Sequence, residues 1–130
     1  MSKKILKIKL PLHIKIGNKN YYLSLNNYRN WHYHKNNIIK QTFKDLPIFF
    51  TLKDMNIDYP IELEYSFYFP DKRTRDLSNF ISVVSKFVED ALTYHNVIKD
   101  DNYKIIRKVT GIYKGIDHKD PRCELRILKL

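Results

Sequence analysis

Alternation of apolar and polar residues predicts strands near both ends and in the middle of the chain. Residues 4–10 (KILKIKL) carry leucine and isoleucine on one face and lysine on the other, which is the period of two expected of a strand. Residues 61–69 (IELEYSFYF) alternate in the same way and stop at Pro70, so we expect a half-buried strand there. Two further strands are expected at residues 103–113 and 122–128.

A hairpin and a helix are expected to follow the first strand. Residues 13–16 and 21–25 flank a four-residue loop, GNKN, whose glycine and asparagines favour the positive φ angles of hairpin turns. From Tyr28 to Leu46 the apolar residues recur at near-helical spacing, which predicts a helix. Its expected boundary residues are Asn26 or Asn27 as the N-cap and Pro47 at the end.

The strongest amphipathic pattern of the chain predicts a second helix at residues 77–95. Its expected buried arc contains Phe80, Val83, Val84, Phe87, Val88, Ala91 and Leu92. The resulting order, β–β–β–α–β–α–β–β, indicates an α+β fold. We expect one domain spanning residues 1–130, with a small mixed β-sheet and the two main helices packed on one of its faces.

Composition adds a basic character to this picture. Lys and Arg number 24 against 14 Asp and Glu, for a formal net charge of +10. Such a surplus favours a polyanionic partner, most simply nucleic acid. The alternative is that the Lys, Asn, Ile and Tyr content reflects AT-rich coding alone. No apolar run approaches the ~20 residues of a membrane span, and the single Cys123 forms no internal disulfide. We therefore expect a cytoplasmic protein with no membrane partner.

Several polar residues of the second helix share one edge of its apolar face. Asn79, Lys86 and Asp90 fall within about 20° of one direction on a helical wheel. The ordinary interpretation is an amphipathic helix with Asp76 as its N-cap and a Lys86–Asp90 pair worth about 0.2–0.5 kcal/mol. The acidic pair that follows, Asp100-Asp101, is then a turn before a strand. The other interpretation is a set of carboxylates that binds a metal ion.

The ordered set of residues from 75 to 101 resembles the signature of the RusA family of Holliday-junction resolvases. The matching residues are Asp76, Asn79, Lys86, Asp90-Ala91-Leu92 and Asp100-Asp101. Weaker support comes from Ser24-Leu25-Asn26-Asn27-Tyr28-Arg29, where the family tends to have Ser-x-Asn with basic and aromatic residues. The resemblance covers residues 24–101. It implies a homodimeric, Mg²⁺-dependent endonuclease of phage or prophage type that resolves four-way DNA junctions by paired symmetric nicks, acting in the host's cytoplasm.

The resemblance also implies roles for individual residues. Asp76 and Asp101 are expected to be metal ligands, followed by Asp100, and Asp90 would be a further ligand or the partner of Lys86. Lys86 would stabilise the scissile phosphate or orient the attacking water. These side chains suit Mg²⁺, which takes oxygen ligands and needs one or two carboxylates, with Mn²⁺ as a substitute. The implied catalytic residues are Asp76, Lys86, Asp100 and Asp101.

The chain departs from the family pattern at two places. Ser78 stands where the family has its second aspartate, and a neutral hydroxyl is a poorer Mg²⁺ ligand. The spacing from Asn79 to Lys86 is four residues longer, which moves Lys86 about 6 Å along the helix on the same face. Glu89 or Glu64 could replace the lost charge. Two alternatives therefore stay open: a catalytically weakened RusA-like DNA-binding protein, or a phage protein that binds a host factor.

Basic residues beside the acidic ones are the expected DNA-binding residues. A basic loop next to a metal site is where backbone phosphates approach, and the expected contacts are Lys72, Arg73, Arg75, Asn79 and Arg29. Arg29, together with Lys35, Lys40 and Lys44, is equally consistent with a solvated helix face. For the sequence Trp31-His32-Tyr33-His34 we expect a packed tryptophan and solvent-facing histidines rather than a metal site. His95 and His118 are expected at the surface, and Cys123 in the core.

Overall fold

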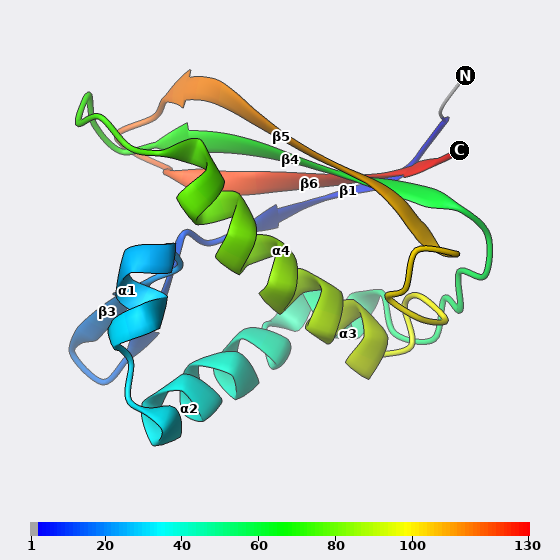
Figure 1. Ribbon diagram of the computed structural model, residues 1–130, viewed down its shortest axis with the longest axis horizontal. Helices are drawn as coiled ribbons and strands as arrows, with labels where there is room; N and C mark the ends of the chain where they lie inside the picture. The colour runs from blue at the N-terminus through cyan, green and yellow to red at the C-terminus, as the bar shows by residue number, and fades with distance from the viewer. Residues whose placement is uncertain (1–2) are drawn as a thin grey trace. The chain divides into compact units, whose positions relative to one another are not determined.

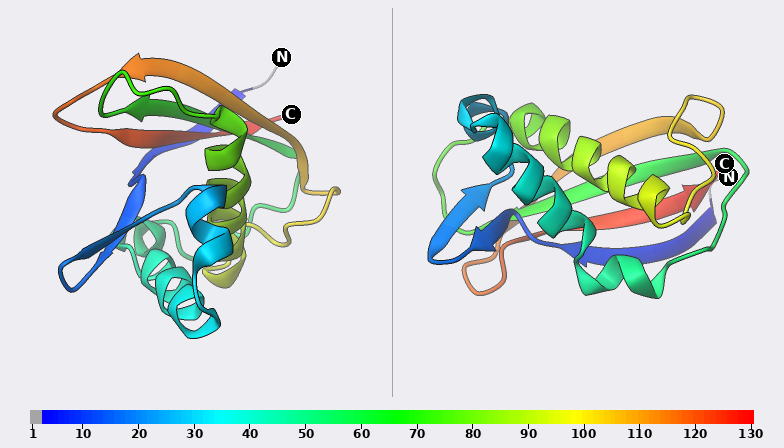
Figure 2. Two further views of the ribbon diagram at one scale, coloured as in Figure 1. Left: turned by 60° about the vertical axis from the view of Figure 1, so that its left-hand side comes forward. Right: turned by 90° about the horizontal axis from the view of Figure 1, so that it is seen from below.

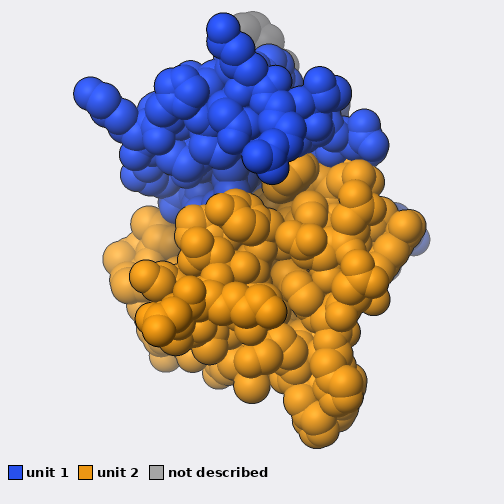
Figure 3. All heavy atoms as spheres, turned by 90° about the vertical axis from the view of Figure 1, so that its left-hand side faces the viewer, with its two compact units in different colours: residues 1–12, 59–78, 102–130 blue, residues 13–58, 79–101 orange. Residues whose placement is uncertain are grey.

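The computed structural model describes residues 3–130 and has an α+β fold, as the order of elements predicts. It contains a mixed four-stranded sheet and a two-stranded sheet together with four helices (Figure 1). The chain divides into two compact units, which are coloured separately in Figure 3. Unit 1 comprises residues 3–12, 59–78 and 102–130, and unit 2 comprises residues 13–58 and 79–101.

Unit 1 is built on the four-stranded sheet. Its strands are β1 (Lys3–Leu10), β4 (Ile61–Phe69), β5 (Ile106–Ile116) and β6 (Arg122–Lys129), arranged in the order β1-β6-β4-β5 (Figure 1). β4 pairs in parallel with β5, whereas β6 is antiparallel to both β1 and β4. Four strands were predicted at these places, and the boundaries of β4 are as predicted. β5 begins three residues later than expected, because residues 102–105 form turns.

Burial of the central strand β4 is greater than its alternating sequence predicts. The expected wet face of this strand includes Glu62 and Ser66, which are only 5% and 3% exposed. Neighbouring strands on both sides explain the difference. Thr110 of β5 donates a 2.6 Å hydrogen bond to the Glu62 carboxylate, and the Lys108 ammonium lies 4.0 Å from it. A strand flanked by long side chains on both neighbours is shielded even on its polar face.

Unit 2 begins with a tight hairpin of β2 (His13–Ile16) and β3 (Lys19–Tyr22). Ile16 pairs with Lys19, so the turn is Gly17-Asn18 alone rather than the expected four-residue loop. Gly17 has φ of 62°, a conformation that glycine adopts without strain and that suits a two-residue hairpin turn. The second strand consequently starts two residues earlier than predicted.

The long helix predicted at residues 28–46 is wrong: two helices with a break between them occupy this region (Figure 2). They are α1 (Leu25–Asn30) and α2 (Tyr33–Lys44), and a third, α3 (Pro47–Thr51), follows. Trp31 and His32 are extended, with ψ of 131° and 147°. The break lets the Trp31 ring pack edge-on against Tyr21 and Tyr28.

Pro47 also differs from its predicted role. It opens α3 at the first helical position rather than ending the preceding helix, which suits a residue that lacks a backbone N–H. The expected N-cap residues Asn26 and Asn27 lie inside α1, and Ser24 occupies the N-cap position instead. N-cap propensity alone does not distinguish Ser24 from Asn26 and Asn27, because serine and asparagine are both favoured at that position.

The second predicted helix is confirmed as α4 (Leu77–Tyr94), and all seven residues of its expected buried arc are buried. Within unit 2, Phe87 of this helix packs against three aromatic rings, those of Tyr28, Trp31 and Phe43, at centroid distances of 5.6–6.4 Å. Aromatic pairs at such distances add to the burial energy of each ring. No helix in the described part of the chain is long and apolar enough to cross a membrane.

Two of the single-residue predictions are confirmed and one is wrong. Cys123 is fully buried in β6, and His118 is exposed. His95, expected at the surface, is only 3% exposed. Its ring stacks on Phe49, and its Nε2 lies 2.6 Å from the carbonyl oxygen of Lys44. The α2–α3 segment covers this histidine, which the local sequence around residue 95 does not reveal.

Candidate functional site

The end of α4 positions the acidic pair Asp100-Asp101. Asn96 adopts φ of 56° and stops the helix; the amide of Val97 donates to the Leu92 carbonyl and that of Asn96 to the Thr93 carbonyl. These two bonds form a Schellman motif, in which asparagine can replace glycine at the left-handed position. The chain is thereby turned sharply just before the two aspartates.

A neighbouring segment of unit 2, residues 54–57, holds the chain after this turn. The amides of Asp54, Asn56 and Ile57 donate to the carbonyls of residues 95, 96 and 97, at 2.9–3.0 Å. The amide of Lys99 donates in return to the Ile57 carbonyl at 2.8 Å. Val97 and Ile98 are also fully buried. Asp100-Asp101 therefore follow a segment that is bonded on both sides rather than a free loop.

Negative charge gathers around this segment. Burial, followed by the charges of Asp101 and Asp90, raises the pKa of Glu89 from 4.5 to about 7. Burial also raises the pKa of Asp101, with further contributions from Asp100 and Asp90. Glu89, Asp90, Asp100 and Asp101, which we call the acidic cluster, thus lie close enough for the charges of their neighbours to act on Glu89 and Asp101. Of the predicted site residues, Asp90, Asp100 and Asp101 are brought together here.

The donor set of the acidic cluster fits Mg²⁺. All its side-chain donors are carboxylate oxygens, which hard divalent cations prefer, and Mg²⁺ needs only one or two of them beside water and phosphate. Within residues 3–130 no three histidine, cysteine or acidic side chains converge on one point that could hold a metal. A divalent cation at the cluster would relieve the repulsion that helps to raise the pKa values of Glu89 and Asp101. Two carboxylates of the cluster would therefore be enough protein ligands for one Mg²⁺ ion.

Lys86, one helical turn before Asp90, contacts an aromatic ring. Its ammonium lies 5.7 Å from the ring centroid of Tyr28, and that of Lys40 lies 5.9 Å from the same ring. A hydrogen bond with Asn36, together with Lys40 and Lys86, lowers the pKa of the Tyr28 hydroxyl. Among the described residues Lys86 forms no ion pair with Asp90. The ordinary interpretation of these two residues as a four-apart pair is therefore wrong.

Asp76 lies in unit 1, exposed, directly before the first residue of α4. It ends a loop at residues 70–76, here called the basic loop. Asp71 organises this loop: its carboxylate accepts from the Arg73 amide at 3.0 Å and lies 2.8 Å from the Arg75 guanidinium. The Arg73 amide and the Arg75 guanidinium lower the pKa of Asp71. Arg75 also donates to the carbonyls of residues 71 and 73, so much of its donor capacity is used within the loop.

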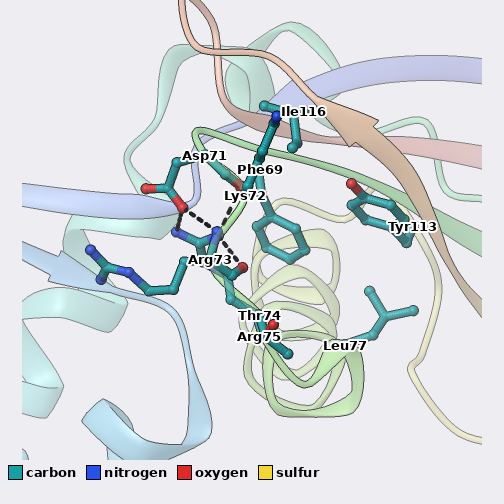
Figure 4. Close-up of a pocket in the computed structure, with 9 residues that line it drawn as sticks. All are labelled: Phe69, Asp71, Lys72, Arg73, Thr74, Arg75, Leu77, Tyr113 and Ile116. Atoms are coloured by element: carbon teal, nitrogen blue, oxygen red, sulfur yellow. Dashed lines mark hydrogen bonds and ion pairs between the residues drawn. The ribbon is translucent and has the colours of Figure 1, made fainter.

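A pocket of about 270 Å³ opens in unit 1 beside the basic loop (Figure 4). The rings of Phe69 and Tyr113 lie in it nearly parallel, with centroids 6.0 Å apart and planes 18° apart. The Arg75 guanidinium lies 5.1 Å from the Phe69 ring centroid. The full lining is Phe69, Asp71, Lys72, Arg73, Thr74, Arg75, Leu77, Tyr113 and Ile116.

The other predicted DNA-binding residues are distributed over both units. Lys72 and Arg73 are exposed on the basic loop, and Arg29 is exposed in the last turn of α1. Asn79 is half-buried in the first turn of α4. Three further lysines, Lys35, Lys40 and Lys44, lie over tyrosine rings of unit 2. These three are therefore partly occupied by cation–π contacts.

The histidines of the Trp31–His34 segment are exposed, as expected. The prediction treated His32 and His34 as two positions of one helix whose side chains diverge, but His32 is the N-cap of α2 rather than a helical residue. Its ring stacks on that of His34 with centroids 5.4 Å apart, and its Nδ1 accepts a hydrogen bond from the His34 amide. His32 thus caps the helix.

In comparisons with known proteins, the sequence matches no protein-family model and no curated protein.

Three residues of these sites had only a minor role, or none, in the predictions from the sequence. Glu89 was considered only as a replacement for the charge lost at Ser78, and its proximity to Asp101 depends on the turn at Asn96. Tyr28 was taken as an apolar helix position and as part of the weaker family match at residues 24–29, and Tyr113 only as part of a strand. Alternation and helical period indicate which face of a strand or helix a residue occupies. They do not indicate which distant residue its side chain contacts.

Proposed function

We propose that this protein is a Mg²⁺-dependent, structure-selective DNA endonuclease of the RusA type that resolves four-way junctions as a homodimer. One observation carries the proposal. The acidic cluster brings four carboxylates together in a chain of net charge +10, and burial, with the charges of Asp101 and Asp90, raises the pKa of Glu89 to about 7. Perturbed carboxylates of this kind are more frequent at functional sites than elsewhere.

The resemblance of residues 75–101 to the RusA signature supports the same function, because three of its aspartates belong to the acidic cluster. Glu89 offers the additional carboxylate that Ser78 does not supply. In the proposed site, Asp101 and Asp90 would hold the metal ion with the help of Asp100 or Glu89. Asp76, which precedes the first residue of α4, is not part of this set. A bound Mg²⁺ would supply positive charge that stabilises the scissile phosphate during hydrolysis.

Protein side chains would perform the remaining tasks. Lys86 would carry positive charge to the phosphate, and Tyr28 would limit the positions open to that ammonium through its ring and hydroxyl. Lys72 and Arg73, exposed on the basic loop, would contact backbone phosphates and set the register of the DNA. Arg75 would keep the loop in shape through Asp71.

A RusA-like DNA-binding protein without catalysis is the second candidate. The observation that favours it is the absence, within residues 3–130, of three acidic, histidine or cysteine side chains converging on one point. Such a protein would use the basic loop and the surplus of lysine, and its affinity for DNA would fall steeply with salt without any need for Mg²⁺.

The deciding experiment is incubation of the purified protein with a labelled synthetic four-way junction, with and without Mg²⁺, beside a linear duplex. We expect paired symmetric nicks in the junction only, and only with Mg²⁺. Asp101→Asn should slow cleavage by roughly 100-fold or more, a loss typical of one group that stabilises the transition state. Binding of the junction by the variant, measured by mobility shift, should persist. Mg²⁺ binding is measured separately by titration calorimetry.

Asp58→Asn is the matched control, because Asp58 is an exposed aspartate of the same unit outside the acidic cluster. It makes the same change in charge and should cleave at the wild-type rate. Junction binding without nicks in Mg²⁺ or Mn²⁺ would select the second candidate. No junction binding even at low salt would exclude both and favour a phage protein that binds a host factor.

A further inference from the structure

The pocket beside the basic loop owes its shape to an irregularity in β5. Phe67 pairs with Tyr113, but Tyr68 pairs with Gly115, so Lys114 is an extra residue in the strand. Because this bulge reverses the alternation, Tyr113 and Ile116 both line the pocket although they are three residues apart. Bulges of this kind re-aim side chains and are frequent beside functional sites.

The floor and the rim of the pocket differ in chemistry. Apolar and aromatic side chains form the floor: Phe69 is 5% exposed, whereas Tyr113 is 52% exposed and presents much of its ring to solvent. Basic side chains form the rim, where Lys72 and Arg73 are exposed on the loop (Figure 4). Asp71, the one acidic residue of the lining, is paired with Arg75. The pocket thus combines open aromatic surface with net positive charge.

We propose that this pocket binds one unstacked base of a DNA strand, with the base on Tyr113 and its flanking phosphates at Lys72 and Arg73. Bases that leave the helical stack are held on aromatic rings and guanidinium planes, while cationic side chains track the backbone. A cavity of about 270 Å³ is below the usual size of sites for larger ligands and suits a single base. The inference rests on the proposed function in taking DNA as the partner.

This assignment gives unit 1 a role separate from phosphodiester hydrolysis. The centre of a branched DNA contains strands that change partners, where a base can leave its stack at less cost than inside a continuous duplex. Capture of such a base would favour branched over linear DNA without reading sequence. Tyr113 is then a specificity-determining residue, while hydrolysis depends on the acidic cluster and Lys86 of unit 2.

The experiment compares binding of two single-stranded oligonucleotides of equal length, oligo-dT and its all-abasic counterpart, by fluorescence anisotropy in EDTA. Both carry the same phosphates, so their difference in affinity measures the contribution of the bases. The wild-type protein should prefer oligo-dT. Tyr113→Ala should weaken oligo-dT binding about tenfold, equivalent to about 1.4 kcal/mol, and leave abasic binding unchanged. Lys72→Ala should weaken both oligonucleotides alike and reduce the salt dependence.

Matched controls separate the pocket from general effects. Tyr113→Phe keeps the ring and should keep the preference for bases. Tyr103→Ala and Lys104→Ala change exposed residues of unit 1 outside the pocket, at the opposite end of β5, and should bind both oligonucleotides as the wild type does. Circular dichroism and the melting temperature show whether each variant is folded.

The outcomes distinguish this inference from the proposed function. Equal affinity of the wild-type protein for the two oligonucleotides overturns the base pocket, even if junctions are cleaved. A preference that survives in folded Tyr113→Ala also overturns it. A preference lost in Tyr113→Ala and retained in Tyr113→Phe, in a protein that never cleaves a junction, supports the pocket and rejects the nuclease.

Discussion

At the scale of single residues, the charge state of Glu89 is the most informative property of the acidic cluster. The carboxyl is half-buried and faces two aspartates, so its pKa rises from 4.5 to about 7. Near neutral pH it therefore exchanges a proton readily and responds to any nearby cation. Its protonation state links pH and stability in one measurable group.

We predict that Glu89→Gln stabilises the protein at pH 8 and has little effect at pH 4.5. A carboxyl with a raised pKa in the folded state keeps its proton between about pH 4.5 and 7, where the unfolded chain has lost it. Stability from this group is fully present below pH 4.5 and is lost as pH rises to about 7. Thermal melts across this range should therefore show a flatter profile for Glu89→Gln than for the wild type.

Asp58→Asn removes one negative charge at an exposed position and serves as the control for this measurement. Its pH profile should run parallel to that of the wild type. If the pH profile of Glu89→Gln also ran parallel to that of the wild type, a raised pKa of Glu89 would be ruled out. The main electrostatic argument for a cation at the acidic cluster would then be lost.

At the scale of elements, α4 owes its position in unit 2 to an aromatic cluster rather than to helix propensity. Phe87 contacts the rings of Tyr28, Trp31 and Phe43, which come from α1, α2 and the break between them. The break at Trp31-His32 is necessary for this packing, since a continuous helix would carry the indole in another direction. The same packing places Tyr28 beside Lys86.

We predict that Phe87→Ala lowers the free energy of unfolding by about 3–5 kcal/mol, the usual cost of removing a buried phenylalanine ring. Phe87 is 2% exposed, so the change leaves a cavity that the surrounding rings fill only in part. Urea denaturation followed by circular dichroism measures the loss. Tyr94→Ala, in the same helix but at a position 57% exposed, should cost no more than about 1 kcal/mol. Similar losses in the two variants would contradict the packing described for α4.

At the scale of the whole molecule, the net charge of +10 and the symmetry of the proposed substrate have different consequences. The charge favours attraction to DNA, and the symmetry of a four-way junction requires a dimer. Long-range attraction brings a basic protein to DNA quickly but does not select a junction. Selection of a four-way junction by symmetry requires two copies of the chain. A twofold dimer presents one active site to each of two opposed strands.

We predict a homodimer, with a mass twice the 15.7 kDa of the chain, in sedimentation equilibrium at micromolar concentration. The same stoichiometry, two chains for one junction, should appear when labelled junction is added. A monomer at every concentration, bound singly to the junction, would remove the physical basis for paired symmetric nicks. Measurement at two salt concentrations separates assembly through specific contacts from aggregation on DNA.

The sequence by itself determined the elements with a strong internal period or a clear stop. β2, β4 and α4 have their predicted boundaries to within one residue, and β1 and β6 do as well. These elements have local signals: strict alternation, the uninterrupted amphipathic pattern of residues 77–94, and the stop at Pro70. Such signals can be recognised without knowledge of the rest of the chain. The α+β class followed from the order of these elements.

Only the tertiary structure decided the features that depend on distant residues. The break at Trp31-His32 exists because aromatic rings from several segments pack there, and His95 is buried because residues 44–50 cover it. The acidic cluster has its geometry because residues 54–57 bond to residues 95–99 across about forty positions of sequence. Burial and pKa depend on what surrounds a group in space, and local periodicity records only the direction in which a side chain points.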